Sequence, residues 1–475
     1  MNPIRLGLTF NDVLLVPKRS PLQSRNEADL KTKFTRNISL NSPLVSANMA
    51  TVTEHKMAIA LAREGGLGVI HQFGTIAEQV EEVKKVKRST SYIIEHPITV
   101  PPFITLGEAI RIMKTENVTS LLVQQHDELI GIFTSRDYLF EDDHTKLIRD
   151  VMTLKERLIT ALPTITLEEA KKILHQHRIE KLPLVNNGKV YGLITTQDIK
   201  KLEYWPNASR DKKGSLLVGA AVGVKDTLVR AKTLIDAGAD VIILDIAHCH
   251  SDLAINQIKE LKKNFVVDIM AGNIATAKAA EDLIKAGADG LKVGIGPSPV
   301  CTTRLMSGAG VPQLTAIMDV VGIAKQYNLP VCADGGMKLP GDAAKALAAG
   351  ASTVFSGSFF AGTDEAPGLI IAKDGKRYKR YMGSASYDSN HERQESKEHK
   401  SIKEKVDVFV EGVAILVDYK GPVSDVIKGL VKGIQSGMSY CGAATMDELH
   451  HNAEFIQITT SGWEESKERG MKLSE

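Results

Sequence analysis

The chain has 475 residues, a net charge of +2, a hydrophobic fraction of 43% and a charged fraction of 24%. These values are ordinary for a folded globular protein, and the near-balanced charge gives no reason to expect nucleic acid or a membrane as a partner. The four cysteines fit neither a disulfide framework nor a common zinc motif, so we expect reduced thiols. The N-terminus has no apolar signal core, and no apolar run approaches the ~20 residues of a membrane span. We therefore expect a cytoplasmic protein.

Short apolar strands recur along the chain, and amphipathic helix patterns lie between them. Helices are predicted over 224–238, 275–287 and 341–350, and an Ala-Gly-Ala motif marks the end of each. Eight such units with strands apolar on both faces indicate an α/β fold, a (β/α)8 TIM barrel rather than an open doubly wound sheet. The strands are expected at 43–47, 66–70, 216–220, 241–245, 267–271, 291–294, 330–334 and 352–356.

The second and third predicted strands are too far apart in the chain to be joined by one helix. Between them, the motif at 104–109 (Ile-Thr-Leu-Gly-Glu-Ala) recurs at 165–170, and the motif at 131–137 recurs at 192–198. Both pairs are offset by 61 residues, which indicates an internal repeat in one register. We predict a repeated module over about residues 92–204, inserted between the two parts of the barrel, 1–91 and 205–475.

Each copy of the repeat resembles a CBS motif, so the inserted module resembles a CBS pair. In that family a Thr and an Asp near the end of each motif bind the ribose of adenine nucleotides. The resemblance implies that adenine or guanine nucleotides bind here and regulate the enzyme. An alternative is that the module only packs against neighbouring subunits. The implied nucleotide-binding residues are Thr134 and Asp137 in the first copy, and Thr195 or Thr196 with Asp198 in the second.

Cys301 ends a glycine-rich turn, Gly294-Ile-Gly-Pro-Ser-Pro-Val-Cys301, that follows an apolar strand. A cysteine thiol is a strong nucleophile where its pKa is lowered and a substrate can reach it. Gly294 and Gly296 allow a ligand to approach the backbone closely, and the following Thr-Thr-Arg adds hydroxyls and a positive charge. A lone cysteine is more often a small buried residue, but these surroundings favour a catalytic nucleophile.

Two more glycine-rich turns follow the seventh and eighth predicted strands. Asp334-Gly335-Gly336 and Ser356-Gly357-Ser358 present backbone N–H groups where TIM barrels often hold phosphate. Asp334 could accept hydrogen bonds from a ribose diol. Either turn alone is typical of a plain left-handed turn, but two adjacent turns beside the cysteine loop favour a phosphosugar ligand.

These motifs resemble the inosine monophosphate dehydrogenase and guanosine monophosphate reductase superfamily. The resemblance runs from residues 8–15 almost to the C-terminus and includes the segments 361–368 and 436–442. It implies that Cys301 attacks C2 of GMP or IMP to form a covalent thioimidate, and that a nicotinamide cofactor exchanges hydride at C2. It also implies a homotetramer, and CBS pairs often stack two such tetramers into an octamer.

The resemblance assigns further residues to the subsites of this family. Asp245, Asn273 and Gly294 would line the nicotinamide side, and the carbonyls of Gly294, Gly296 and Cys301 would hold potassium. The implied substrate-binding residues are Asn48, Asp334, Gly335, Gly336, Gly357, Ser358, Tyr381, Gly383, Ser384, Ala385 and Glu411.

The flap that follows the base-binding segment bears on the direction of the reaction. A dehydrogenase must hydrolyse the thioimidate, and the family uses an Arg-Tyr pair on a flap, expected here between 386 and 411. No Arg-Tyr dipeptide occurs there, and Lys397-Glu398 stands at the corresponding position. The reductase adds no water: it releases ammonia, with Thr303 and Glu365 handling protons, and takes hydride from NADPH. We predict a GMP reductase; the alternatives are an IMP dehydrogenase that uses NAD and a catalytically weak purine-nucleotide sensor.

Three positions depart from the pattern of the family. Ser298-Pro299 replaces the usual Gly-Ser before the cysteine, and Gln72 stands where lysine is usual; both favour the sensor hypothesis. Cys249 lies between two histidines, which resembles a metal site but is more typical of a loop detail.

Overall fold

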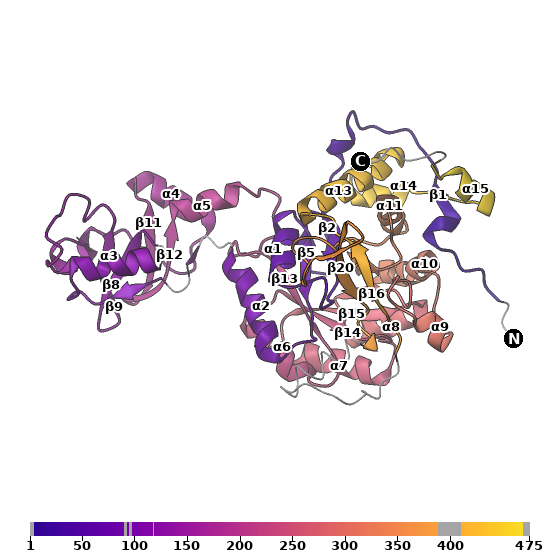
Figure 1. The fold of residues 1–475 in the computed structure, drawn as a ribbon, viewed down its shortest axis with the longest axis horizontal. Coiled ribbons are helices and arrows are strands. Elements are labelled where there is room, and N and C mark those ends of the chain that lie inside the picture. Colours follow the sequence, from indigo (N-terminus) through magenta and orange to yellow (C-terminus); the bar gives the residue numbers. More distant parts are fainter. Residues whose placement is uncertain (1–3, 90–92, 95–96, 117, 388–409, 469–475) are drawn as a thin grey trace. The chain divides into compact units, whose positions relative to one another are not determined.

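The computed structural model describes residues 4–89, 93–94, 97–116, 118–387 and 410–468 (Figure 1). The chain forms two compact units. The first unit comprises Met1–Ser89, Asn207–Ser209 and Leu216–Glu475, and the second comprises Thr90–Pro206 and Arg210–Ser215. The segment expected at 92–204 therefore falls within the second unit.

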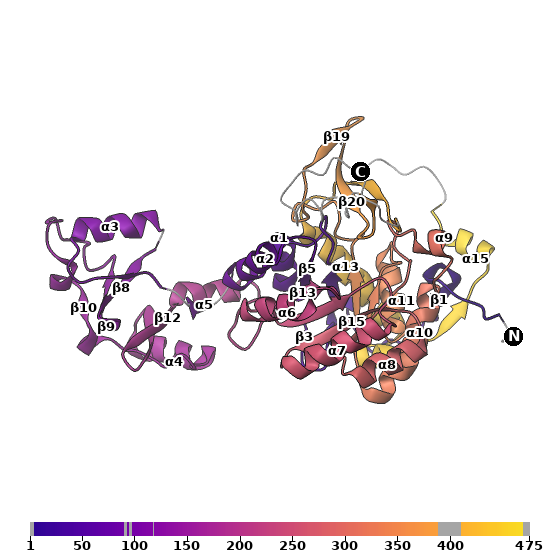
Figure 2. The same ribbon diagram turned by 90° about the horizontal axis from the view of Figure 1, so that it is seen from below.

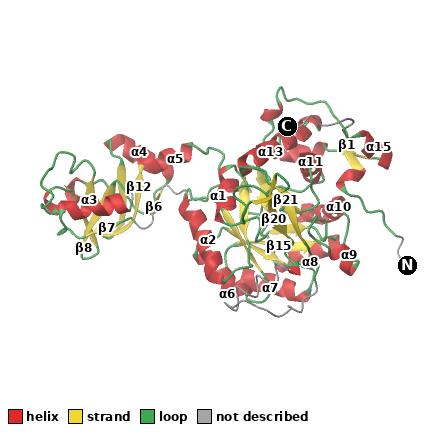
Figure 3. Cartoon of the chain, in the orientation of Figure 1, coloured by secondary structure: helices red, strands yellow, loops and turns green. Residues whose placement is uncertain are grey.

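The first unit is built around a closed barrel of eight parallel strands in the order β13-β14-β15-β16-β17-β18-β4-β5 (Figure 3). Each strand coincides with a predicted apolar run, which confirms the α/β barrel architecture. Their bounds are β4 (Leu44–Ser46), β5 (Leu67–Ile70), β13 (Val218–Val222), β14 (Val241–Asp245), β15 (Asp268–Ile274), β16 (Gly290–Val293), β17 (Val331–Asp334) and β18 (Thr353–Ser356).

Helices alternate with the barrel strands and surround them. The side chain of Thr276 caps the N-terminus of α8, and Gly287, with φ of +104°, ends that helix, as the Ala-Gly-Ala motif predicts. Among the described residues, no helix has both the length and the apolarity to cross a membrane. The helices are α1 (His55–Arg63), α2 (Ile76–Ser89), α6 (Thr227–Asp236), α7 (Asp252–Asn264), α8 (Ala277–Ala286), α9 (Thr303–Ser307), α10 (Gln313–Ala324), α11 (Pro340–Ala348), α13 (Val423–Tyr440), α14 (Met446–Asn452) and α15 (Thr460–Glu465).

Three small sheets complete the first unit. The strands β19 (Ile371–Lys373), β20 (Lys376–Met382) and β21 (Ala414–Asp418) form an antiparallel sheet that stands out from the barrel (Figure 2). β1 (Val13–Leu15) pairs with β22 (Phe455–Gln457), and β2 (Thr32–Lys33) pairs with β3 (Ser39–Leu40).

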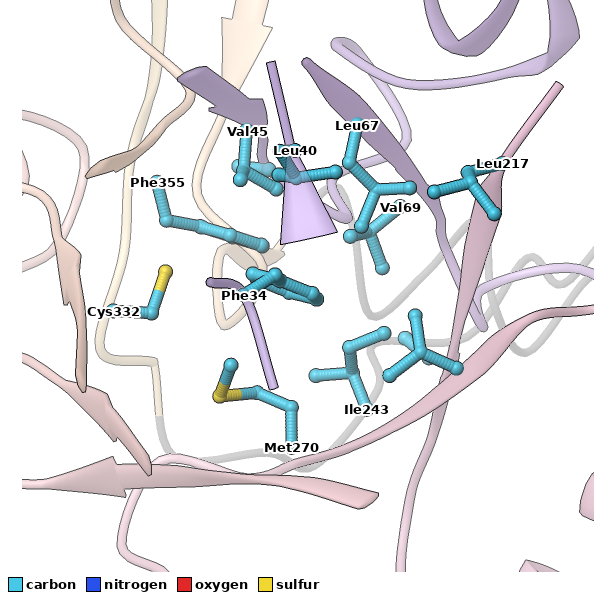
Figure 4. Packing of buried hydrophobic residues seen from close by; sticks show 13 residues of the cluster. Phe34, Leu40, Val45, Leu67, Val69, Leu217, Ile243, Met270, Cys332 and Phe355 are labelled. Atoms are coloured by element: carbon cyan, nitrogen blue, oxygen red, sulfur yellow. The ribbon is translucent and has the colours of Figure 1, made fainter. Parts of the chain in front are cut away.

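Apolar side chains fill the interior of the barrel (Figure 4). Phe34, which follows β2, is fully buried among them, and the backbone N–H of Arg36 donates to the carbonyl of Asp289 just before β16. The β2–β3 pair therefore closes the amino ends of the strands and leaves the carboxyl ends for a ligand. The buried cluster consists of Phe34, Leu40, Val45, Ala47, Leu67, Val69, Leu217, Ala221, Val241, Ile243, Met270, Cys332 and Phe355.

The second unit contains the same arrangement twice. A helix, α3 (Leu106–Thr115) or α4 (Leu167–His177), is followed by two antiparallel strands, and each helix begins with a Thr–Glu capping box. Corresponding elements lie about 61 residues apart, so the fold repeats with the sequence. The strands are β8 (Ser120–Gln125), β9 (Glu128–Thr134), β11 (Lys181–Asn186) and β12 (Lys189–Thr195), with β6 (Ile93–Ile94), β7 (Thr99–Val100), β10 (Thr153–Leu154) and helix α5 (Thr196–Glu203).

Candidate active site

A cavity of about 430 Å³ opens at the carboxyl ends of the barrel strands. Of the first-unit residues that the sequence assigned to catalysis or binding, all except Glu365 line it. The lining residues from that set are Asn48, Asp245, Asn273, Gly294, Gly296, Cys301, Thr303, Asp334, Gly335, Gly336, Gly357, Ser358, Tyr381, Gly383, Ser384, Ala385 and Glu411.

Cys301, Thr303 and Glu411 form a row of potential proton carriers in this cavity. The Cys301 Sγ lies 3.2 Å from the Thr303 Oγ1, which donates to the Glu411 Oε2 at 3.3 Å. The backbone fixes the same contact, because the Thr302 N–H donates to the Glu411 carbonyl at 2.8 Å. The arrangement joins a nucleophile to a carboxylate through one hydroxyl, which suits it to moving a proton as a bond to sulfur forms or breaks.

Glu365, which was expected to handle protons together with Thr303, is not among the residues that line the cavity. Its Oε2 accepts a hydrogen bond at 2.8 Å from the backbone N–H of Val423, the first residue of α13. Glu365 therefore caps a helix in this structure, and the carboxylate that contacts Thr303 is that of Glu411. The chain gave no local signal for this pairing, because Thr303 and Glu411 are 108 residues apart.

A charged cluster lies at the carboxyl ends of β14, β16 and β17. Lys292 contacts the Asp245 Oδ1 at 2.7 Å and the Asp334 Oδ2 at 2.8 Å. Asn48, expected in substrate binding, donates to the other oxygen of Asp245 at 2.7 Å. Asn273 donates to the Asp334 Oδ2 at 2.8 Å. Sequence analysis missed Lys292, although a lone charge within an otherwise apolar strand is the signal that could have found it.

The glycine-rich turns leave room at the other side of the cavity. Gly335 and Gly336 both have φ of +80°, a conformation that other residues rarely adopt. A Cβ at Gly357 would lie 2.5 Å from the Tyr381 hydroxyl, so this approach also requires glycine. Burial raises the pKa of Tyr381, although a hydrogen bond with Ser298 lowers it in part. Tyr381 is therefore a neutral hydrogen-bond donor suited to a phosphate. Ser298, which stands one position before the expected serine, still places its hydroxyl beside Tyr381.

One of the three carbonyls expected to hold potassium has a hydrogen-bond partner in the structure. The Gly294 carbonyl accepts a hydrogen bond at 2.6 Å from the Asn273 side chain, so one of the three expected ligands already has a donor. A backbone carbonyl has a second lone pair for a cation, so the potassium site stays a prediction, and we derive no chemical step from it.

The remaining unusual positions have ordinary contacts. Gln72 lines the cavity and donates to the backbone carbonyl of Asp245 at 3.2 Å. Burial raises the pKa of the Cys249 thiol to about 12, and the neighbouring His250 pairs with Asp282 at 2.9 Å. Within the described ranges, no group of three or more His, Cys, Asp or Glu side chains could hold a metal ion. The Lys397-Glu398 pair lies outside the described residues.

The second unit has its own cavity, of about 300 Å³, lined by residues from both copies of the repeat. Thr134, Asp137, Thr195 and Thr196 line it, whereas Asp198 does not and instead accepts a hydrogen bond from Thr195 at 2.6 Å. Glu180 forms an ion pair with Arg136, one of the cationic residues that line this cavity. Its cationic lining residues are Arg136, Arg157, Arg178 and Lys181.

Comparison with known proteins identifies the family. Residues 7–469 match the model of the IMP dehydrogenase / GMP reductase domain. The chain is 51% identical to inosine-5'-monophosphate dehydrogenase of Nitrosopumilus maritimus (strain SCM1), over 98% of this chain and 99% of the relative. It is 45% identical to GMP reductase of Leishmania donovani, over 97% of this chain and 96% of the relative.

A solved structure agrees with these relatives. A cysteine-to-alanine variant of GMP reductase from Trypanosoma brucei, in complex with guanosine 5'-monophosphate, superposes with a TM-score of 0.87 at 42% identity, and 99% of each chain is covered. Because both sequence and fold match over nearly the whole length, the chain belongs to the IMP dehydrogenase / GMP reductase family of purine nucleotide oxidoreductases.

Proposed function

We propose that the protein is a GMP reductase, which converts GMP and NADPH to IMP, ammonia and NADP. The observation that carries this proposal is the row formed by Cys301, Thr303 and Glu411. It provides a nucleophile and a proton path, and the flap segment 386–411 contains no Arg-Tyr pair to activate water. Such a site can expel an amine from a purine but is poorly equipped for hydrolysis.

The first step forms a bond between sulfur and the purine. The Cys301 Sγ adds to C2 of GMP, and its proton passes through Thr303 to Glu411. The same path returns a proton to the exocyclic amine, the C2–N bond breaks, and ammonia leaves behind a thioimidate at Cys301. A reduced nicotinamide held on the side of Asp245 and Asn273 would supply the hydride that C2 accepts. Breakage of the C2–S bond then releases IMP and leaves the Cys301 thiolate, which takes up one proton from solvent to restore the thiol.

The other lining residues bind and orient the reactants. The Asp334 carboxylate and the Gly335-Gly336 and Gly357-Ser358 turns face the ribose and phosphate of the nucleotide, with Tyr381 as a further donor. Asp245 and Asn273 lie on the nicotinamide side. Orientation of this kind contributes to catalysis because the reacting atoms are held close together before the chemical step.

An IMP dehydrogenase is the second candidate. The relative from Nitrosopumilus maritimus carries that name and is more similar in sequence than the GMP reductase from Leishmania donovani. The same cysteine chemistry would then run on IMP and NAD, and water would release the product. This reading requires a base for hydrolysis other than an Arg-Tyr pair.

Parallel assays of the purified protein separate these candidates. With GMP and NADPH we expect a fall in absorbance of the reduced cofactor and release of one ammonia per hydride transferred, because the site lacks the Arg-Tyr pair. With IMP and NAD we expect turnover at least about a hundredfold slower, the scale of a missing general base. Robust formation of xanthosine monophosphate would favour the dehydrogenase, and binding without turnover of either pair would favour the nucleotide sensor.

For the second unit we propose a CBS pair that binds a purine nucleoside phosphate and regulates the enzyme. Its support is a cavity that carries both Thr134 and Asp137, suited to ribose, and several cationic side chains, suited to phosphates. The expectation of a tetramer or octamer belongs to this proposal as well.

Replacing Arg157 or Arg178 with alanine should weaken nucleotide binding to the second unit. Each guanidinium offers charge-assisted hydrogen bonds to phosphate, so we expect the Kd for ATP or GTP to rise about tenfold per variant. Calorimetric titration of the whole protein, with the cavity around Cys301 saturated by IMP, measures this constant. Lys171→Ala on the same unit, which removes an exposed cation paired with Glu168, should leave it unchanged. Equal Kd values for all three variants would exclude this cavity as the site.

A further inference from the structure

Lys292 is the only charged residue of β16, and its side chain is only 2% exposed. Its ammonium contacts three acceptors: the Asp245 Oδ1 at 2.7 Å, the Asp334 Oδ2 at 2.8 Å, and the Asn273 Oδ1. An ammonium has three hydrogens to donate, so its hydrogen-bonding capacity is fully used inside the protein.

The charge on Lys292 is fixed by its partners. Burial alone would lower the pKa of this lysine, but the charges and hydrogen bonds of Asp245 and Asp334 raise it above the ordinary lysine value. The ammonium also lies 4.9 Å from the centre of the Phe355 ring, a favourable cation–π distance. Lys292 is therefore a buried ammonium between two carboxylates from different strands, and these carboxylates favour its charged form.

Asp334 is left with one carboxylate oxygen for a ligand. Its Oδ2 accepts hydrogen bonds from the Lys292 ammonium and from the side-chain amide of Asn273. No donor among the residues that the structure describes contacts Oδ1, although the side chain lines the cavity and is 20% exposed. An oxygen held in this way can accept a hydrogen bond without further reorganisation.

We propose that Lys292 is a positioning residue: through its ion pair it orients the Asp334 carboxylate toward the ribose hydroxyls of the nucleotide. This inference rests on the proposed nucleotide site and deepens it. Without the ammonium, Asp245 and Asp334 would repel each other inside a partly enclosed site, and the carboxylate would turn or take up a proton. Recognition of the ribose should therefore depend on Lys292.

Discrimination between ribose and deoxyribose tests the proposal. The Kd values of GMP, 2'-deoxy-GMP and 3'-deoxy-GMP are measured by titration, without turnover. For the unchanged protein we expect at least one deoxy nucleotide to bind about tenfold more weakly, as befits loss of a hydrogen bond to a charged group. For Lys292→Met we expect the ratio of the Kd of this deoxy nucleotide to the Kd of GMP to fall to about two or less, because Asp334 is no longer oriented. A loss of stability alone would not change this ratio.

The control is a lysine–carboxylate pair at the opposite end of the same strand. Lys262 contacts the Asp289 Oδ2 at 2.7 Å, just before β16 and away from the cavity. Lys262→Met should reduce thermal stability but keep the ribose discrimination of the unchanged protein. A folded Lys292→Met protein with that same discrimination would overturn the proposal.

Two further measurements keep the test decisive if Lys292→Met does not fold. Lys292→Gln removes the charge but keeps a polar group and should also lose discrimination. Thermal unfolding of each variant shows whether it is folded under the conditions in which the Kd values are measured. Failure of the unchanged protein to bind either GMP or IMP would instead refute the proposed function.

Discussion

Cys301→Ala is expected to abolish turnover while leaving nucleotide binding nearly intact. The Cys301 Sγ is the atom proposed to bond to C2 of the purine, and neighbouring hydroxyls cannot replace it, because a neutral alcohol is a far weaker nucleophile than a thiolate. We expect the rate of NADPH oxidation with GMP to fall on the order of 10⁴-fold or more, as when a nucleophile is removed from other covalent enzymes. The Kd for GMP should change by less than about threefold, since the phosphate and ribose contacts remain.

Cys441→Ala provides a matched control for this variant. Cys441 is buried at the end of α13 and does not line the cavity, so its loss removes a sulfur without touching the site. Its kinetic constants should equal those of the unchanged protein. Substantial turnover by Cys301→Ala, in either direction of the reaction, would exclude the covalent mechanism.

Glu411→Gln is expected to slow the chemical step because it removes the carboxylate at the end of the proton path. The amide keeps the size and polarity of the side chain but cannot accept the proton relayed from Cys301 through Thr303. General acid–base assistance of this kind contributes roughly 10²–10⁴ in rate, so kcat should fall by about that factor. The KM for GMP should change little. Steady-state assays over GMP concentration separate the two constants.

Glu365→Gln tests the alternative assignment made from the sequence. Glu365 accepts from the first backbone N–H of α13, so the amide can still cap the helix, and only the favourable charge at the helix N-terminus is lost. We expect a loss of stability of at most about 1 kcal/mol and an unchanged kcat. The opposite pattern, a slow Glu365→Gln and an active Glu411→Gln, would return the proton-handling role to Glu365.

The sequence predicted the barrel strands because each is a short apolar run bounded by glycine or a helix pattern. Parallel strands alternating with helices bring all their carboxyl ends to one side. For that reason the turns at Gly294, Asp334 and Gly357 were expected to share one cavity, and the structure brings them together. The 61-residue repeat was equally visible, because a repeated fold needs the same caps and strands in each copy.

The contacts between side chains within the cavity were harder to predict from the sequence. The role expected for Glu365 came from the resemblance to the reductases, and a matching motif does not fix which group a carboxylate contacts. Likewise, the Gly294 carbonyl accepts a hydrogen bond from the Asn273 side chain, a contact between neighbouring strands that no periodic pattern encodes.

The sequence by itself determined the architecture, the candidate nucleophile and the end of the barrel that carries the cavity, since these depend on local patterns of apolar residues, glycines and motifs. Only the tertiary structure decided that Glu411 rather than Glu365 meets Thr303 and that Lys292 joins Asp245 to Asp334. The physical reason is that these pairs come from segments distant in the chain. Their geometry depends on how the strands and loops pack, and a side chain acts on whichever group that packing places within hydrogen-bonding distance.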